Sequence, residues 1–154
     1  MKLATLLYIR NSKGEYLLMN RKKNPNKGLL SPPGGKLHTD EAESPSACAV
    51  REAMEECSMK SAEGDWSLTG IITEKNFPDA GNIMIFLMTY KYAYNVLPPP
   101  CNEGEFTFVS PDEIMSMDIP ETDRQFIWDI LKKEASEPFI ITLDCTNYPK
   151  IIKI

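Results

Sequence analysis

The chain has 154 residues, of which 42% are hydrophobic and 25% are charged. This is the usage of an ordinary soluble globular protein, so the composition indicates neither a disordered nor a fibrous chain. The longest apolar run is far too short to span a bilayer. The formal net charge is −5, which argues against a nucleic acid polymer as partner. The length predicts one domain over residues 1–154.

The four cysteines form no Cys-x-x-Cys pair, and the chain has one histidine, His38. This combination argues against a zinc site, a secreted disulfide scaffold and a histidine-based nucleophilic triad. The apolar start of the chain lacks a small-residue cleavage site, so we interpret it as a strand rather than a signal peptide. We therefore expect a cytoplasmic protein.

Two apolar, β-prone stretches over 3–10 and 15–21 open the chain, and the Asn- and Gly-containing segment 11–14 between them predicts a hairpin. Residues 29–30 begin another short strand. The sequence Pro-Pro-Gly-Gly at 32–35 then predicts an irregular loop, because prolines remove amide donors and glycines permit backbone conformations that other residues avoid.

Ser44 and Pro45 predict the start of a helix, as an N-cap followed by proline at the first helical position, and this helix continues to about Cys57. Three β-like stretches follow, at 66–74, 82–94 and 105–109. A second helix is predicted over 121–135 and a final strand over 139–144. Strands that flank two helices in this order predict an α+β layered sandwich.

The first of these helices has an apolar face and an acidic face. At about 100° per residue, Glu52, Glu55 and Glu56 fall within one arc, where their charges repel each other unless a cation intervenes. Oxygen ligands without histidine or thiolate are those that magnesium or manganese prefers. A solvated face with an ordinary Arg51–Glu55 pair is the simpler explanation of the helix alone. The glycine loop just upstream, which ends at Lys36, favours the metal site because it can bring carbonyls and amides to the same ion.

Gly35, Glu43 and the segment Arg51-Glu52-Ala53-Met54-Glu55-Glu56-Cys57-Ser58-Met59 resemble the Nudix box, which reads Gly, five residues, Glu, seven residues, Arg-Glu-apolar-x-Glu-Glu-x-Gly-apolar. The seven residues between Glu43 and Arg51 fit the box, whereas the interval from Gly35 to Glu43 is two residues too long. Glu41 fits the glycine spacing instead, but the helix start at 44–45 favours Glu43. Serine at 58 replaces the last glycine of the box.

This resemblance implies an α/β/α sandwich with a mixed central sheet between helices, and a pyrophosphohydrolase that uses Mg²⁺, with Mn²⁺ as an alternative. The implied metal ligands are one carbonyl and three carboxylates, those of Gly35, Glu52, Glu55 and Glu56. Glu55 and Glu56 are also candidate bases, Arg51 orients the glutamates, and Glu105 stands where many members carry a further acidic group. For Glu105, an exposed glutamate at the start of a strand is an equally good explanation. The implied reaction is attack of metal-activated water on a phosphorus of the pyrophosphate link.

The layout is also similar to the MutT-like branch, which acts on oxidised purine nucleoside triphosphates in the manner of an 8-oxo-dGTP diphosphatase. In the base-side loop, Ser31 stands where the branch usually has a base-reading asparagine, and Gly34 and Lys36 are further candidates for substrate contact. Ile119 stands where the animal enzymes stack a tryptophan. These two departures weaken the inherited substrate preference.

Further candidates for substrate contact are Glu121 and Asp123, which resemble the acidic base-reading segment ahead of the final helix. The alternative is that both acids cap that helix, where they favour the positive end of its dipole. Arg21, with the lysines that follow it, is a candidate for phosphate contact, and a solvated basic loop is the alternative.

Three functional hypotheses remain open. The leading one is hydrolysis of a nucleoside triphosphate, with an oxidised purine as one option, to a monophosphate and pyrophosphate. The second keeps the chemistry but takes ADP-ribose, a dinucleoside polyphosphate or another nucleotide conjugate. The third is a Nudix module that binds a small-molecule nucleotide without cleaving it, although such modules tend to lose box glutamates that are all present here.

Overall fold

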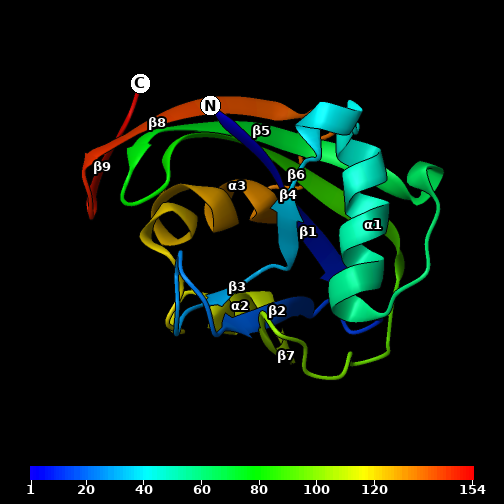
Figure 1. Cartoon of the computed structure of the whole chain (residues 1–154). Coiled ribbons are helices and arrows are strands. Elements are labelled where there is room, and N and C mark those ends of the chain that lie inside the picture. The colour runs from blue at the N-terminus through cyan, green and yellow to red at the C-terminus, as the bar shows by residue number, and fades with distance from the viewer.

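The computed structural model describes all 154 residues, and its central element is a nine-stranded mixed sheet (Figure 1). The hydrogen-bonded strand order is β3-β2-β1-β6-β5-β8-β9, with β4 paired to β1 and β7 paired to β2. The pairs β1–β6 and β5–β8 are parallel. The strands are β1 (Lys2–Arg10), β2 (Tyr16–Arg21), β3 (Leu30–Ser31), β4 (Gly34–Lys36), β5 (Trp66–Phe77), β6 (Gly81–Ala93), β7 (Gly104–Val109), β8 (Phe139–Asn147) and β9 (Lys150–Lys153).

The helices are few and mostly short. They comprise α1 (Pro45–Cys57), α2 (Pro111–Ile114), and a last helix made of a π-helical segment η3 (Asp123–Ile127) that continues into α3 (Trp128–Lys132). Two 3₁₀ turns, η1 (Thr39–Glu41) and η2 (Glu63–Asp65), lie on either side of α1 in the sequence. None of these helices has the length and apolar character needed to cross a membrane.

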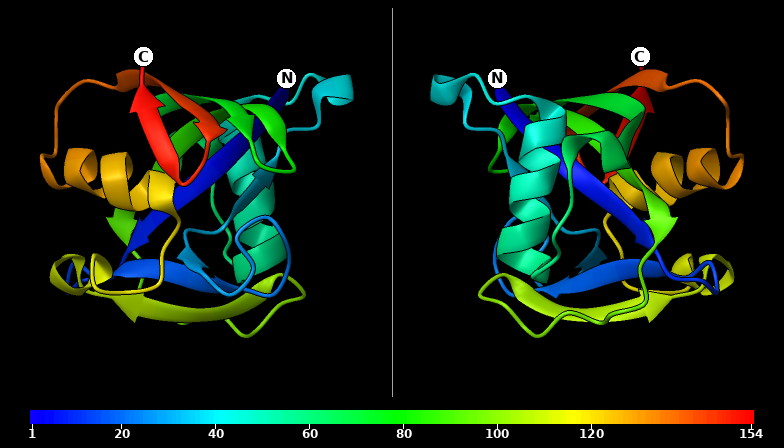
Figure 2. Two further views of the ribbon diagram at one scale, coloured as in Figure 1. Left: turned by 90° about the vertical axis from the view of Figure 1, so that its left-hand side faces the viewer. Right: turned by 90° about the vertical axis from the view of Figure 1, so that its right-hand side faces the viewer.

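The sheet separates two apolar cores, one under α1 and the other under the last helix (Figures 1 and 2). Successive residues of β1 show the division, because side chains alternate between the two faces of a strand. Leu7 and Ile9 pack in the core with α1, whereas Tyr8 packs in the other core with Trp128. This arrangement confirms the predicted α+β sandwich with a mixed sheet between helices.

Of the predicted N-terminal hairpin, only the turn and the strand residues next to it are formed. Asn11 Oδ1 accepts hydrogen bonds from the backbone amides of Lys13 at 3.0 Å and Glu15 at 2.9 Å, which closes a tight reversal. Beyond it, β1 and β2 are paired only at Arg10 and Tyr16. The strands then diverge, because β1 pairs along most of its length with β6 while β2 pairs with β7.

The prediction of an irregular loop over Pro-Pro-Gly-Gly was wrong for its second half. Gly34 begins β4, which pairs with β1 through Leu6 opposite Gly34 and Thr5 opposite Gly35. A Cβ atom at Gly34 would lie 2.1 Å from the carbonyl oxygen of Thr5, so only glycine permits so close an approach. The glycines therefore allow a strand pairing that also fixes the loop against the sheet.

The helix predicted from Ser44 and Pro45 is confirmed as α1. Ser44 Oγ accepts a hydrogen bond from the Ala47 amide at 3.0 Å, as expected of an N-cap. The helix ends at Ser58, whose φ of +50° is left-handed and whose amide bonds back to the carbonyls of Ala53 and Met54. The residue that departs from the box glycine thus does occupy the conformation that favours glycine.

The later elements match the predicted order with shifted ends. The predicted strands 66–74, 82–94 and 105–109 correspond to β5, β6 and β7. The last helix ends at Lys132 rather than 135 and contains the π-helical segment, and β8 extends to Asn147. Strand β9 was not predicted, because its four residues are too few to show a pattern.

Candidate active site

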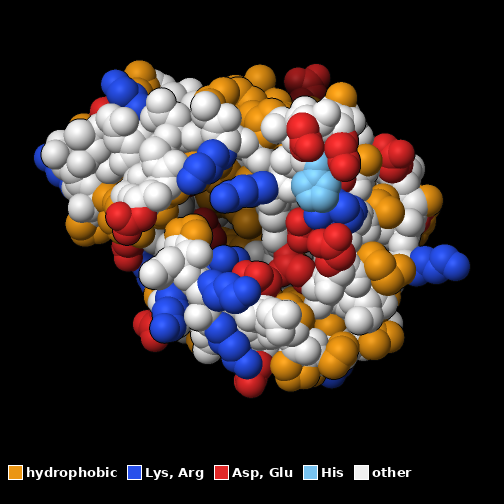
Figure 3. Space-filling model, in the orientation of Figure 1, with side chains coloured by type: hydrophobic (Ala, Val, Ile, Leu, Met, Phe, Trp, Pro, Cys, Tyr) orange, Lys and Arg blue, Asp and Glu red, His pale blue; other side chains and the backbone are white.

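A cavity of about 1140 Å³ opens between α1 and the start of the last helix, with walls from β1, β4, β5 and β6. In Figure 3 a hollow is visible in this face of the molecule, bordered by both basic and acidic side chains. Most of the predicted site residues line it, namely Arg21, Ser31, Gly34, Gly35, Lys36, Arg51, Glu52, Glu55, Glu56 and Asp123. Glu105 and Glu121 do not.

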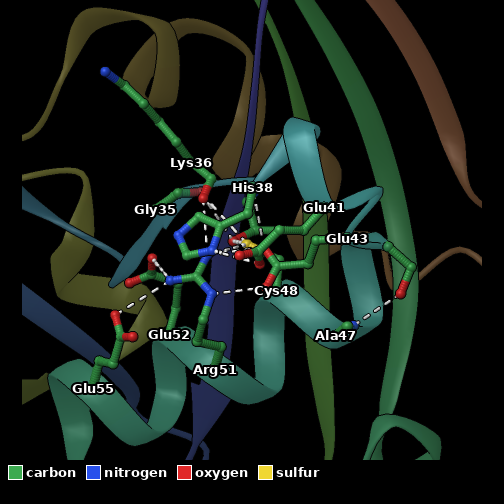
Figure 4. Close-up of polar contacts among 12 residues, drawn as sticks. Gly35, Lys36, His38, Glu41, Glu43, Ala47, Cys48, Arg51, Glu52 and Glu55 are labelled. Carbon is green, nitrogen blue, oxygen red and sulfur yellow. Dashed lines mark hydrogen bonds and ion pairs between the residues drawn. The ribbon is translucent and has the colours of Figure 1, made fainter.

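Arg51 is the centre of the hydrogen-bond network at the α1 end of the cavity (Figure 4). Its Nε and Nη2 atoms donate to the two carboxylate oxygens of Glu43 at 2.7 and 2.9 Å, a bidentate arrangement. Its Nη1 atom donates to Glu52 Oε1 at 2.8 Å and to Glu55 Oε2 at 3.2 Å. The Lys36 carbonyl accepts from Nη2 at 2.9 Å. All three guanidinium nitrogens are engaged, so Arg51 positions the glutamates.

The two-residue insertion ahead of α1 folds so that Glu43, and not Glu41, reaches Arg51. The extra length is taken up by η1, and Ala42 after it has a left-handed φ of +53°. The backbone amide of His38 donates to Glu43 Oε1 at 3.0 Å, while Glu41 Oε2 lies 3.4 Å from the His38 ring. The hydrogen bonds from Arg51 lower the pKa of Glu43 to about 2, so this carboxylate stays charged and anchors the arginine.

Glu52 and Glu56 are buried against the two glycines of β4. Glu56 Oε1 accepts a hydrogen bond from the Gly34 amide at 3.1 Å, whereas Glu56 Oε2 is buried with no partner. The Glu52 carboxylate lies directly on Gly35, where a Cβ atom would come within 2.2 Å of Glu52 Oε1. Burial, with the nearby charge of Glu52, raises the pKa of Glu56 to about 8, and burial also raises the pKa of Glu52.

These groups fit a hard divalent cation. The donor set consists of oxygen atoms, one buried carboxylate oxygen has no partner, and the negative charge of the pair is incompletely offset within the protein. No three His, Cys, Asp or Glu side chains form a closed cation site. Magnesium commonly keeps several waters and bridges to substrate phosphates, so a partial set of protein ligands suits it.

A second buried acidic group lies in the cavity beyond the reach of this network. Glu74 of β5 and Asp123 of the last helix are each 4% exposed, and the Thr122 hydroxyl donates to Asp123 Oδ1 at 3.4 Å. Sequence reasoning missed Glu74 and Thr122. The available signal was period-2 alternation, because Glu74 falls on the same face of β5 as the core residue Ile72.

The structure does not bring Glu105 or Glu121 to the cavity. Glu105 projects from the outer face of β7, where its side chain is 66% exposed and lies 3.6 Å from Lys22 Nζ. Glu103, two residues earlier and ahead of the strand, lines the cavity instead. Glu121 accepts a hydrogen bond from Gln125 Nε2 at 3.0 Å and lies 3.5 Å from Arg124, so its side chain interacts with residues of the first turn of the last helix.

The remaining predicted residues line the cavity in different roles. Arg21 Nε donates to the Pro25 carbonyl at 2.8 Å, and its Nη2 atom lies 4.0 Å from Glu103, so its guanidinium is partly engaged within the chain. Ser31 is 5% exposed on the cavity wall. Lys36 is exposed at the rim and makes no ion pair within the chain.

A family model for the NUDIX domain matches residues 1–130. The chain belongs to the Nudix family. This membership supports enzyme status and is consistent with hydrolysis of nucleoside diphosphate-linked substrates, and Nudix hydrolases generally use divalent metals.

Solved structures share the Nudix fold of this chain at low sequence identity. The MutT protein of Bacillus halodurans has a TM-score of 0.76 and 19% identity, covering 99% of this chain and 95% of that one. The MutT protein of Methanosarcina mazei Go1 has a TM-score of 0.73 and 24% identity, with 88% and 96% covered. The NUDIX domain of Shewanella oneidensis NrtR, solved with ADP ribose, has a TM-score of 0.68 and 14% identity, with 86% of each chain covered.

Proposed function

We propose that this Nudix protein hydrolyses a nucleoside triphosphate to the nucleoside monophosphate and pyrophosphate in the presence of Mg²⁺, with Mn²⁺ as a substitute. The observation that carries the proposal is that one cavity is lined by two sets of residues. The glutamates of α1 form one set, and the buried acids Glu74 and Asp123, among apolar side chains, form the other. At about 1140 Å³ the cavity is large enough for a base, a sugar and three phosphates.

The α1 end of the cavity supplies the groups that the reaction needs. Glu52, Glu56 and the Gly35 carbonyl would hold the cation, with Glu55 as a further ligand. Bound magnesium would supply a Lewis acid that offsets the negative charge of the phosphates. The Glu55 side chain is 57% exposed and its one hydrogen bond within the chain comes from Arg51, so the attacking water can reach this carboxylate, which would act as the base.

Basic side chains at the rim suit the phosphates that lie beyond the cation. Lys2 and Lys36 line the cavity and make no ion pair within the chain, and Arg21 lines it beside Glu103. In a protein whose formal net charge is −5, such local positive charge would draw a polyphosphate to the site. Asp123 and Ser31 would then contact the base.

The preference for an oxidised purine is a finer proposal. Ser31 lines the cavity in place of the expected asparagine, and Ile119 is 3% exposed in the core. The chain therefore offers neither the amide nor the stacking ring of the MutT-like pattern. ADP-ribose is a second candidate substrate, because the Nudix domain of Shewanella oneidensis NrtR was solved with that ligand.

A substrate panel tests these proposals. The purified protein is incubated with Mg²⁺ and, separately, with the four ribonucleoside and four deoxyribonucleoside triphosphates, 8-oxo-dGTP, ADP-ribose or a dinucleoside polyphosphate. We expect release of monophosphate and pyrophosphate from at least one triphosphate, and loss of turnover when EDTA replaces Mg²⁺. Cleavage of ADP-ribose alone would support the second candidate, and tight binding without cleavage would favour a non-catalytic module.

Two variants connect the turnover to the α1 glutamates. Glu56→Gln keeps the size of the side chain but removes the charge that the cation requires, so it should abolish most of the turnover. Glu113→Gln is the matched control, because Glu113 is exposed on α2, outside the cavity, and its side chain makes no hydrogen bond or ion pair. Full turnover in Glu56→Gln would show that catalysis lies elsewhere.

A further inference from the structure

Away from α1, the cavity has apolar walls that come from several separate elements. Phe77, the last residue of β5, lines it together with Ile83 and Ile85 of β6 and Ile127 of the last helix. Apolar walls with a few polar groups are the usual construction of a site for a flat heterocycle. This part of the cavity, which we call the nucleoside end, therefore suits the base and sugar of a nucleotide.

The turn that joins β8 to β9 contacts two of the elements that form the nucleoside end. It lies outside residues 1–130, which the family model matches. The Tyr148 amide donates to the Cys145 carbonyl at 3.0 Å, which closes the turn beside the start of the last helix (Figure 2). No residue of this turn lines the cavity, so the turn can affect a ligand only through the elements that it contacts.

The first of these elements is the end of β5. The ladder between β5 and β6 is irregular between Glu74 and Phe77, so strand pairing alone does not fix the position of Phe77. The Tyr148 ring supports it instead, in an edge-to-face contact with 5.2 Å between ring centroids and 67° between ring planes. Asn76 Nδ2 donates to Thr146 Oγ1 at 2.9 Å, which adds a second link between the turn and this end of β5.

The second element is the first turn of the last helix. The amides at the start of a helix lack partners within it, and Thr122 makes no side-chain capping bond here. The Tyr148 hydroxyl accepts a hydrogen bond from the Glu121 amide at 3.4 Å and so supplies one partner. Gln125 Nε2 also donates to the Pro149 carbonyl at 3.2 Å. One tyrosine thus joins the helix start to the wall residue Phe77.

We propose that Tyr148 is a positioning residue that fixes Phe77 and the start of the last helix relative to each other, and so preforms the nucleoside end. This inference rests on the proposed function, because it assumes that a nucleoside lies between these walls. A wall that is already held in place loses less freedom when a ligand binds, which increases affinity. Tyr148 makes no hydrogen bond with α1, so nucleoside binding should depend on it while the chemical step should not.

Nucleoside monophosphates measure this role without hydrolysis. Titration calorimetry on the full chain in EDTA identifies the tightest binder among AMP, GMP, CMP and UMP, and its affinity is then compared between variants. Tyr148→Ala should weaken binding about 10-fold, whereas Tyr148→Phe, which keeps the ring against Phe77, should weaken it only about 2- to 3-fold. Lys150→Ala, at an exposed position of the same hairpin, should leave the affinity unchanged. Equal affinities in all variants, or no binding of any monophosphate, would overturn the proposal.

A double-variant cycle tests whether Tyr148 acts through Phe77. Phe77→Leu removes the ring on which Tyr148 packs. In that background Tyr148→Ala should weaken binding only about 2- to 3-fold, because the hydroxyl contact with the helix start is all that remains to be lost. The same 10-fold loss in both backgrounds would contradict an action through Phe77.

Kinetics separate a positioning role from a general loss of structure. On the best triphosphate of the panel, Tyr148→Ala should raise KM and leave kcat nearly unchanged, as expected when only nucleoside binding is weakened. A parallel fall in kcat would show that the substitution disturbs the whole site and would overturn the proposal. Weaker monophosphate binding by Tyr148→Ala in a protein that hydrolyses no triphosphate would refute only the proposed function. Hydrolysis with unchanged KM and affinity in this variant would refute only the role of Tyr148.

Discussion

The cavity contains two groups of buried acids, which offset their charge in different ways. At the α1 end, Arg51 donates to Glu43, Glu52 and Glu55, so most of the negative charge has a cationic partner in the protein. At the other end, Glu74 and Asp123 have no cationic partner, and burial raises the pKa of each to about 7. The hydrogen bonds of Arg51 favour the charged forms of Glu43 and Glu52, whereas burial raises the pKa of Glu56, which Arg51 does not reach, to about 8. The α1 end therefore lacks a cationic partner at Glu56, whereas Glu74 and Asp123 both lack one.

The largest expected effect concerns the charge at the α1 end. Glu55→Gln removes the carboxylate of the exposed α1 glutamate proposed as the base, while Arg51 keeps its bidentate contact with Glu43. We expect kcat to fall by about 10²- to 10⁴-fold, the usual contribution of a general base. Steady-state kinetics on the best triphosphate of the panel measures it.

The outcome distinguishes a base from a metal ligand alone. If Glu55 acts only as a ligand, a higher Mg²⁺ concentration should restore most of the activity of Glu55→Gln. If it accepts the proton, kcat stays low at saturating Mg²⁺. Unchanged kcat and an unchanged Mg²⁺ requirement would exclude both roles.

A smaller loss is expected when the cationic partner at this end is weakened. Arg51→Lys retains the charge but cannot bind Glu43 through two nitrogens while also reaching Glu52. Partners that orient metal ligands contribute about 10- to 100-fold to activity or metal affinity, so we expect a loss of that size with a higher half-saturating Mg²⁺ concentration.

The control for Arg51→Lys is Arg10→Lys. Arg10 forms an exposed ion pair with Glu134 outside the cavity, and such pairs contribute little to stability. We expect this variant to keep the activity and the Mg²⁺ requirement of the unmodified protein. Full activity of Arg51→Lys would mean that a simple charge suffices and that the bidentate geometry is not needed.

Glu74 and Glu43 are expected to contribute to stability with opposite pH dependences. The pKa of Glu74 is raised from 4.5 to about 7 in the folded protein, so folded Glu74 binds more protons than unfolded Glu74 across this range. Its contribution to stability is therefore complete below about pH 4.5 and is lost as the pH rises towards 7. Glu74→Gln should stabilise the protein by about 1 to 3 kcal/mol at pH 8 and have little effect at pH 4.

Thermal unfolding at the two pH values measures this difference. Glu113→Gln, at an exposed position, should change the melting temperature little at either pH. Glu43 is expected to behave in the opposite way, because its pKa is lowered to about 2 and its ion pair stabilises the fold above pH 4.5. A Glu74→Gln protein that is less stable at pH 8 would show that the Glu74 charge is offset within the protein.

The sequence predicts the α1 end of the cavity far better than the other end, for a physical reason. Ser44 and Pro45 fix the start of α1 locally, and the helical repeat then places Glu52, Glu55 and Glu56 on one arc. Their relation to one another needs no knowledge of the rest of the chain. The glutamate spacing and the adjacent glycines are therefore readable as a motif.

The pair at the other end depends on contacts between residues 49 positions apart in the sequence. Glu74 is one glutamate in a long strand, and nothing near it in the sequence shows that Asp123 packs against the same cavity. The pairings of β1 with β6 and of β2 with β7 were likewise not evident, since they join distant segments. Local patterns identified the strands but not their neighbours.

The smallest expected effect concerns Ser58, which replaces the last glycine of the Nudix box. Ser58 ends α1 with a φ of +50°, a conformation that is costly for residues with a Cβ atom. Ser58→Gly should stabilise the protein by about 1 kcal/mol at most, since the relief of strain exceeds the greater chain entropy of unfolded glycine. For a domain of this size we expect a rise in melting temperature of about 2 to 4 °C.

Ser58→Ala separates the backbone effect from the loss of the hydroxyl. Alanine keeps the Cβ atom and hence the strain, and the exposed Ser58 hydroxyl makes no hydrogen bond, so this variant should not be more stable than the original. Activity should be unchanged in both variants, because Ser58 does not line the cavity. A gain in stability from alanine, or a loss from glycine, would show that the left-handed backbone at this position is not the source of strain.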